Sequence, residues 1–382
     1  MRRPVVLVLC FALVAIFVAG LLAIATPSDA LEARIALEVP LTRWKELGGS
    51  DDLGALAPPP VPTGVNAAPV YRRAFAELAR LDEADRKLLG LHALRNRPGR
   101  VTAIASRLDA VVAVAHEAAK VSACEWNRGF YRTGAPTRDD LGEFDQLVKL
   151  AVAVAAHAID RAEANDFGTA VADLAAMRRM AGHALDHPYV TQAAMGLFID
   201  IAALDVLERL FRDHELPGGG AVDFTALRDH RAAMRRTFLT HGTGSLLQLD
   251  DPGFTSTGSR EDWQRDRAKA WLLEAMCDYV AALDEPGKWE VRTSAPPAGV
   301  DYAGVLVPSS SVLEAIYTAA TRNDMAVAAI KLRSHRATAG HYPDSWVVPV
   351  NPDTGVVLQY RRVDDGFVLS SDEGAKLDWR WE

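Results

Sequence analysis

The sequence predicts a mainly α protein with an N-terminal membrane anchor, an antiparallel helical bundle or solenoid-like domain, and a small C-terminal antiparallel β module packed on a long helix. Three observations carry this prediction. Residues 5–25 form an unbroken apolar run. Apolar residues then recur every three or four positions over most of the chain, which is the helical period. Only residues 356–381 alternate with the period of a strand.

The apolar run 5–25 follows Arg2 and Arg3. As a helix it is about 31 Å long, which matches the hydrocarbon core of a bilayer. The positive-inside rule places the N-terminus in the cytoplasm and the C-terminal domain in the periplasm, so we expect a single-pass protein of the bacterial inner membrane. The run exceeds a typical cleaved signal, and residues 1–30 are therefore expected to be a signal anchor. The small residues at 23–25 fit a cleavage site, which leaves a cleaved, secreted form as the alternative.

Composition restricts the partners of the chain. The net charge is −8, which argues against a nucleic-acid surface because phosphate binding needs clustered Lys and Arg. Hydrophobic residues make up 49% of the chain, enough for a core. Outside the anchor only Cys124 and Cys277 remain, and we expect them to be buried and not bridged.

Residues 31–65 are expected to be an amphipathic stalk and a Pro-rich spacer. A short helix over residues 31–47 should break at Pro40. The sequence APPPVP at 57–62 is typical of an extended, semi-rigid spacer. Asn66 is a plausible helix cap and begins the globular part.

Residues 66–308 read as a helical domain. Apolar stripes at helical spacing predict three consecutive helices, formed by Phe144, Leu147, Ala151, Val154, Ala158 and Ala162, by Ala170, Leu174, Met177, Ala181 and Leu185, and by Leu197, Ile201, Leu204, Leu207 and Phe211. The short polar connection at 165–167 predicts that the first two pack antiparallel. These stripes indicate core packing and no cofactor site.

After a Gly-rich break, the helical pattern returns at 223–238. Residues 240–260 lack a sustained period and contain four glycines, so a long functional or mobile loop is expected there. Helices are predicted again at 261–283 and at 309–338.

The C-terminal module covers residues 309–382. Strands are predicted at 356–362 and 366–370 around the turn Asp364-Asp365-Gly366, with a third strand at 377–381. Because a hairpin is unstable alone, we expect the module to dock on the helical domain through aromatic residues, namely Tyr360, Phe367, Trp379 and Trp381.

Two stretches resemble known families. The sequence NAAPVYRRA at 66–74, CEW at 124–126 and the paired helices up to Phe211 resemble a loose family of uncharacterised bacterial proteins that are membrane-anchored or secreted and helical. That resemblance implies an architecture and no activity. The sequence GHYPDS at 340–345 and the segment from 351 to 370 are similar to the C-terminal module of type II secretion major pseudopilins.

The pseudopilin resemblance implies a helix, a turn, a loop and a hairpin. In pseudopilins the module follows the apolar helix directly, whereas here a long domain intervenes, and their calcium-binding loop is not recognisable at 371–374. We therefore expect a shared small module and no membership of a pseudopilus.

Few residues suggest chemistry. His183 and His187 lie one helical turn apart, as in metal sites, but no third ligand is identifiable and a helix C-terminus explains them equally. Ser245 sits in a Gly-rich sequence that departs from G-x-S-x-G at both glycine positions. The acidic pairs Asp250-Asp251 and Glu261-Asp262 are typical of a solvated loop. We assign no catalytic residue, no cofactor and no metal.

We therefore expect a non-enzymatic scaffold or interaction protein, with the membrane and other envelope proteins as partners and no nucleic acid. Antiparallel helix pairs resemble solenoid units, which offer extended binding faces. The alternative is an extracytoplasmic hydrolase with a site in the loop 240–260.

Overall fold

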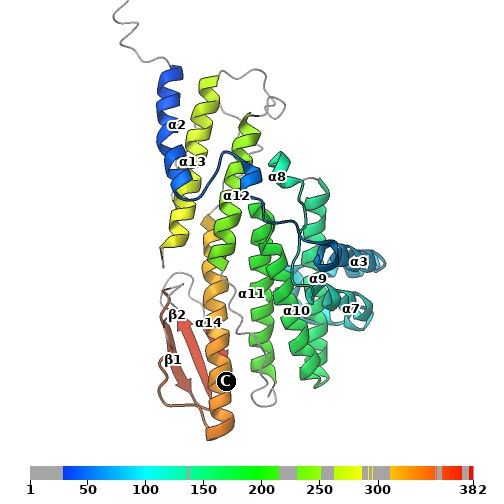
Figure 1. Ribbon diagram of the computed structural model, residues 1–382. Helices are drawn as coiled ribbons and strands as arrows, with labels where there is room; N and C mark the ends of the chain where they lie inside the picture. The colour runs from blue at the N-terminus through cyan, green and yellow to red at the C-terminus, as the bar shows by residue number, and fades with distance from the viewer. Residues whose placement is uncertain are drawn as a thin grey trace, which may run out of the picture.

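Three long antiparallel helices form the centre of the molecule in the computed structural model (Figure 1). They are α9 (Arg138–Glu163), α10 (Phe167–Leu185) and α11 (Val190–Asp213). Their facing surfaces are rich in fully buried alanine and leucine. The structure describes residues 29–135, 138–214, 230–250, 262–285, 291, 295, 310–348, 350, 355–371 and 378–381.

Local signals explain how these helices reverse direction. Asn165 adopts a left-handed conformation with φ 63°, and the Asp166 side chain accepts a hydrogen bond from the Thr169 N–H at 3.2 Å, which caps α10. At the next contact a Cβ on Gly196 would lie 2.6 Å from the Ala181 carbonyl oxygen, so α11 can approach α10 closely only with glycine there. The predicted antiparallel helices are confirmed.

Shorter helices cover one side of this centre. In chain order, the helices here, with 3-10 helices labelled η, are η1 (Leu53–Leu56), η2 (Thr63–Val65), α3 (Ala68–Ala79), α4 (Glu83–Leu88), α5 (Leu91–Asn96), α6 (Pro98–Thr102), η3 (Ala105–Arg107), α7 (Asp109–Ala119) and α8 (Phe130–Thr133). α3 and α7 pack on each other and on α9. Asn66 accepts hydrogen bonds from the backbone N–H groups of Ala68 and Glu125, so its side chain joins the start of α3 to a later loop. The cap position of α3 is Ala67, one residue after the predicted Asn66.

At one end of the molecule α2 (Asp29–Glu46) lies beside α13 (Asp262–Asp284) (Figure 1). The two run parallel, and Arg43 pairs with Asp278 at 2.7 Å. The predicted break at Pro40 is wrong, because α2 continues through it. The proline removes a single backbone N–H donor, and packing along α13 compensates for that loss. Trp44 is fully buried, so this helix is part of the body and does not form a free stalk.

α12 (His230–Asp250) corrects a second expectation. Residues 240–250 are helical, so the loop predicted at 240–260 is wrong for this half, and residues 251–261 lie outside the described part. The glycines that suggested a loop serve close packing instead. A Cβ on Gly242 would lie 2.7 Å from Trp44, and one on Gly244 would lie 3.0 Å from the Gly134 carbonyl oxygen. A tertiary contact therefore explains the glycine content.

The C-terminal part follows the prediction. The long helix α14 (Ser310–Ala339) precedes β1 (Leu358–Val363), β2 (Gly366–Ser371) and β3 (Asp378–Trp381). The strands form an antiparallel sheet in the order β1-β2-β3.

Docking of this sheet on the helices is also confirmed. Phe367 is fully buried and meets Tyr342 edge to face at 5.0 Å between ring centroids. The Arg336 guanidinium lies over the Tyr342 ring, 5.2 Å from its centroid. Phe367 and Leu369 belong to the same apolar cluster as the central helices. The side chains of Trp379 and Trp381 lie outside the described part.

One described helix, α11, is long and apolar enough to cross a membrane. Its most apolar window is 78% buried inside the protein, which is typical of a core helix. The apolar run 5–25 lies outside the described residues.

Candidate functional site: a cleft along α11

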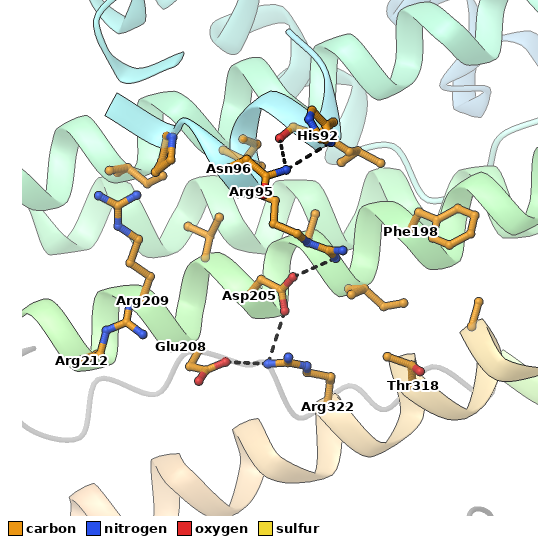
Figure 2. Close-up of a pocket in the computed structure, with 18 of the residues that line it drawn as sticks. His92, Arg95, Asn96, Phe198, Asp205, Glu208, Arg209, Arg212, Thr318 and Arg322 are labelled. Atoms are coloured by element: carbon orange, nitrogen blue, oxygen red, sulfur yellow. Dashed lines mark hydrogen bonds and ion pairs between the residues drawn. The ribbon is translucent and has the colours of Figure 1, made fainter. Parts of the chain in front are cut away.

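A cleft of about 1280 Å³ opens between α5, α11 and α14 (Figure 2). α11 forms its floor from Phe198 to Asp213, a distance of about 22 Å along a helix axis. α5 forms one wall and α14 the other.

The floor of the cleft is apolar. Leu94, Ile159, Ile201, Ala202 and Val206 line it from three helices. Phe198 lies at one end with 38% of its surface exposed, which is unusual for a large aromatic residue in this protein. This end offers contact to an apolar group.

A row of alternating charges crosses the middle of the cleft. Arg95 of α5 lies 3.4 Å from Asp205 of α11, and Arg322 of α14 lies 3.3 Å from the same carboxylate and 2.5 Å from Glu208 (Figure 2). Burial raises the pKa of Glu208, while the Arg322 charge and the backbone N–H of Arg380 oppose that rise. The row therefore connects both walls to the floor and also reaches strand β3.

The end of the cleft opposite Phe198 carries Arg209 and Arg212 (Figure 2). Both pair with Asp213, at 3.3 and 3.2 Å, and Arg209 also lies 3.9 Å from Glu163. Arg95 on the same side has 71% of its side chain exposed. Among the cleft residues of α14, Glu314 is exposed. Both sides of the cleft carry charges of both signs, because three arginines stand with three carboxylates on the α5–α11 side and Glu314 stands with Arg322 on α14.

These groups suit binding better than bond cleavage. His92 is the histidine among the described lining residues, and its Nδ1 is engaged by the Asn96 amide at 3.1 Å. An apolar floor between charged walls can hold a segment that carries apolar side chains on one face and charged side chains on its flanks.

The histidine pair singled out in the sequence serves the core. His183 Nδ1 lies 2.9 Å from the Tyr71 hydroxyl, and its carbonyl oxygen accepts a hydrogen bond from Trp126 Nε1 at 2.8 Å. His187 Nδ1 accepts the Tyr189 backbone N–H at 3.0 Å. Both rings are buried, and no group of three potential ligands able to hold a metal occurs among the described residues.

The serine and the acidic residues singled out in the sequence do not form a site among the described residues. Ser245 lies inside α12 and is 2% exposed. Asp250 pairs with Lys269. Asp251, Glu261 and the Asp262 side chain lie outside the described part.

Cys124 and Cys277 are both free and buried, as predicted. Burial raises the pKa of Cys277 to about 11 and raises that of Cys124 further. Both thiols are therefore protonated at neutral pH and unreactive.

The sequence did not indicate the cleft. Its polar residues come from three helices that are far apart in the chain, and each reads as an ordinary solvated helix face. The available signal was the density of charge at 205–213, where acidic and basic residues follow an otherwise apolar helix. No protein-family model, known protein or solved structure matches the chain, so the cleft is interpreted from its own chemistry.

Proposed function

We propose that this protein is held in the bacterial inner membrane by residues 5–25 and that its periplasmic body works as a non-enzymatic interaction protein, binding a segment of another envelope protein in the cleft along α11. The arginines ahead of the apolar run support the orientation. The resemblance of residues 66–74 and 124–126 to membrane-anchored or secreted bacterial proteins agrees with it. The observation that carries the binding role is the apolar floor between two walls that present exposed charged side chains.

The dimensions favour a protein segment. A floor of about 22 Å is as long as a helix of about 15 residues or an extended strand of about seven. The apolar side chains of the segment would cover Phe198 and Ile201. Acidic side chains would face Arg95 and Arg212, and a basic one would face Glu314. Such an arrangement gives specificity through charge and affinity through the apolar centre.

A hydrolase with its site at 240–260 receives less support. The helical part of that segment buries Ser245, and the glycines around it pack against other helices. The cleft, in contrast, contains no residue of α12 among its lining residues.

A photo-crosslinking amino acid at Phe198 or Thr318 tests the binding role in intact cells. We expect both positions to form an adduct with the same partner, and mass spectrometry should map it to one amphipathic segment. Lys87, exposed on α4 and not among the residues that line the cleft, is the control position and should form no such adduct.

Charge reversal tests the contact directly. The double substitution Arg95→Glu and Arg212→Glu should abolish the adduct at Thr318, whereas Lys149→Glu on the exposed face of α9 should leave it unchanged. Adducts of equal yield at the cleft and control positions would contradict the proposal.

A further inference from the structure

A carboxylate is buried between two histidines where α7, α9 and α10 meet. Asp173 of α10 is 0% exposed. One of its oxygens lies 2.6 Å from His116 Nε2 of α7, and the other lies 2.6 Å from His157 Nδ1 of α9. A carboxylate removed from water needs a compensating charge, since hydrogen bonds from neutral groups leave its charge in place.

The geometry at His157 identifies the source of that charge. Its Nδ1 faces Asp173, and its Nε2 faces the Asp109 carboxylate of α7 at 3.5 Å. A neutral imidazole has one N–H donor and one lone pair, so one nitrogen would direct its lone pair at a carboxylate. An imidazolium donates from both nitrogens and fits both partners.

We propose that His157 is a proton-binding site that joins α7 to α9 and α10, and that loss of its proton loosens α7. The chain Asp109–His157–Asp173–His116 then works as a pH-sensitive clasp. In its protonated state the His157 imidazolium of α9 stabilises the carboxylates of Asp109 on α7 and Asp173 on α10. Without the proton, Asp173 keeps a buried negative charge and Asp109 faces a lone pair.

The neighbouring charges support this assignment. Asp173 and Asp109 raise the pKa of His157, whereas burial and Arg161 on the same helix lower it. The raising effects are larger, so the pKa of His157 lies above that of an ordinary histidine. Arg161 is itself paired with Asp160 at 2.7 Å. Asp166, just before α10, interacts with both Arg161 and His157. On the surrounding elements, Arg73 of α3 is paired with Glu117 of α7, and Arg107 of η3 with Asp85 of α4.

The direction of the pH effect follows from the sign of the shift. The folded state binds the His157 proton more tightly than the unfolded chain does. The resulting stabilisation is complete below the ordinary histidine pKa, about 6.5, and is lost as pH rises through the higher pKa of the folded protein. If the protein faces the periplasm as proposed, a change in the external pH would change the protonation of His157.

NMR of the full chain in detergent, labelled at histidine, tests the proton site. The His157 signals are assigned by their loss in His157→Gln. We expect His157 to keep its proton to a higher pH in the folded protein than in the denatured chain, because Asp173 raises its pKa. Asp109→Asn should lower its proton affinity. Titration of His157 in the folded protein at or below its value in the denatured chain would overturn the proposal.

Hydrogen exchange tests the clasp, and it compares helices within one sample. Between pH 6 and pH 9, protection of α7 amides should fall by tenfold or more after correction for intrinsic exchange, while protection of α13 should not. His157→Gln should remove this pH dependence, and His92→Gln should keep it. An equal loss in α7 and α13, or an unchanged response in His157→Gln, would show that no clasp exists.

Discussion

The indole of Trp44 lies directly against Gly242, because a Cβ at that glycine would come within 2.7 Å of the ring atom Cη2. A Cβ on Gly49 would approach the same indole to 2.2 Å. Trp44 therefore occupies a slot that only glycines leave open, and this slot fixes α2 to the body of the protein.

Filling that slot should destabilise the protein. We expect Gly242→Ala to lower the free energy of unfolding by about 1–3 kcal/mol, because the added methyl group must displace Trp44 in a closely packed core. Thermal melting of the full chain in detergent measures the effect. Gly142→Ala is the matched control: Gly142 lies in α9 with open space around it, and alanine there should raise stability slightly. Equal effects of the two substitutions would contradict the slot.

A second core feature is an ion-paired carboxylate. Asp200 is buried and accepts hydrogen bonds from Arg178 at 2.9 Å and His230 at 3.0 Å. Asp200→Asn should cost about 3–5 kcal/mol, because it leaves a buried guanidinium without its carboxylate. Denaturant unfolding measures this loss. Asp145→Asn removes an exposed pair with Lys149 and should cost less than about 1 kcal/mol.

The same carboxylate predicts acid sensitivity. Burial raises the pKa of Asp200, but the hydrogen bond from His230 and the charge of Arg178 outweigh burial, so its pKa lies below the usual value. A depressed pKa gives stability that is complete above the unfolded value, about 3.9, and is lost as pH falls through the folded value. Wild type should therefore lose more stability between pH 5 and pH 3 than Asp200→Asn. Parallel curves for both proteins would refute the assignment.

The C-terminal sheet should contribute to the stability of the helices. Ending the chain after Gly340 removes Phe367 and Leu369 from the common core, and we expect a lower melting temperature and binding of an apolar dye. Phe367→Ala, a milder change, should cost about 3–5 kcal/mol. A truncated protein that melts like the full chain would show that the module is an independent appendage.

The orientation in the membrane is testable without the structure. A reporter that is active only in the periplasm should be active when fused after Glu382, because the positive-inside rule applied to Arg2 and Arg3 predicts a cytoplasmic N-terminus. The protein should also stay in the membrane pellet after a carbonate wash. A soluble mature form that starts near Thr26 would instead identify a cleaved signal.

The sequence by itself determined the three central helices and the C-terminal hairpin, because these depend on local periodicity and turn residues. The stripes over 144–162, 170–185 and 197–211 correspond to α9, α10 and α11. The turn Asp364-Asp365 separates β1 from β2, with Asp364 at a φ of 47°. Short connections were sufficient to predict that neighbouring helices pack antiparallel.

Only the tertiary structure decided the remaining features, because they depend on contacts between residues that are far apart in the chain. Gly242 suggested a loop until Trp44 was seen to require its missing side chain. Pro40 suggested a break until packing on α13 offset the lost hydrogen bond. The cleft and the proposed His157 clasp are likewise formed by residues that separate helices bring together. Each of these residues is unremarkable in its own segment, and its charge acquires a role only through the partners that folding brings within hydrogen-bonding distance.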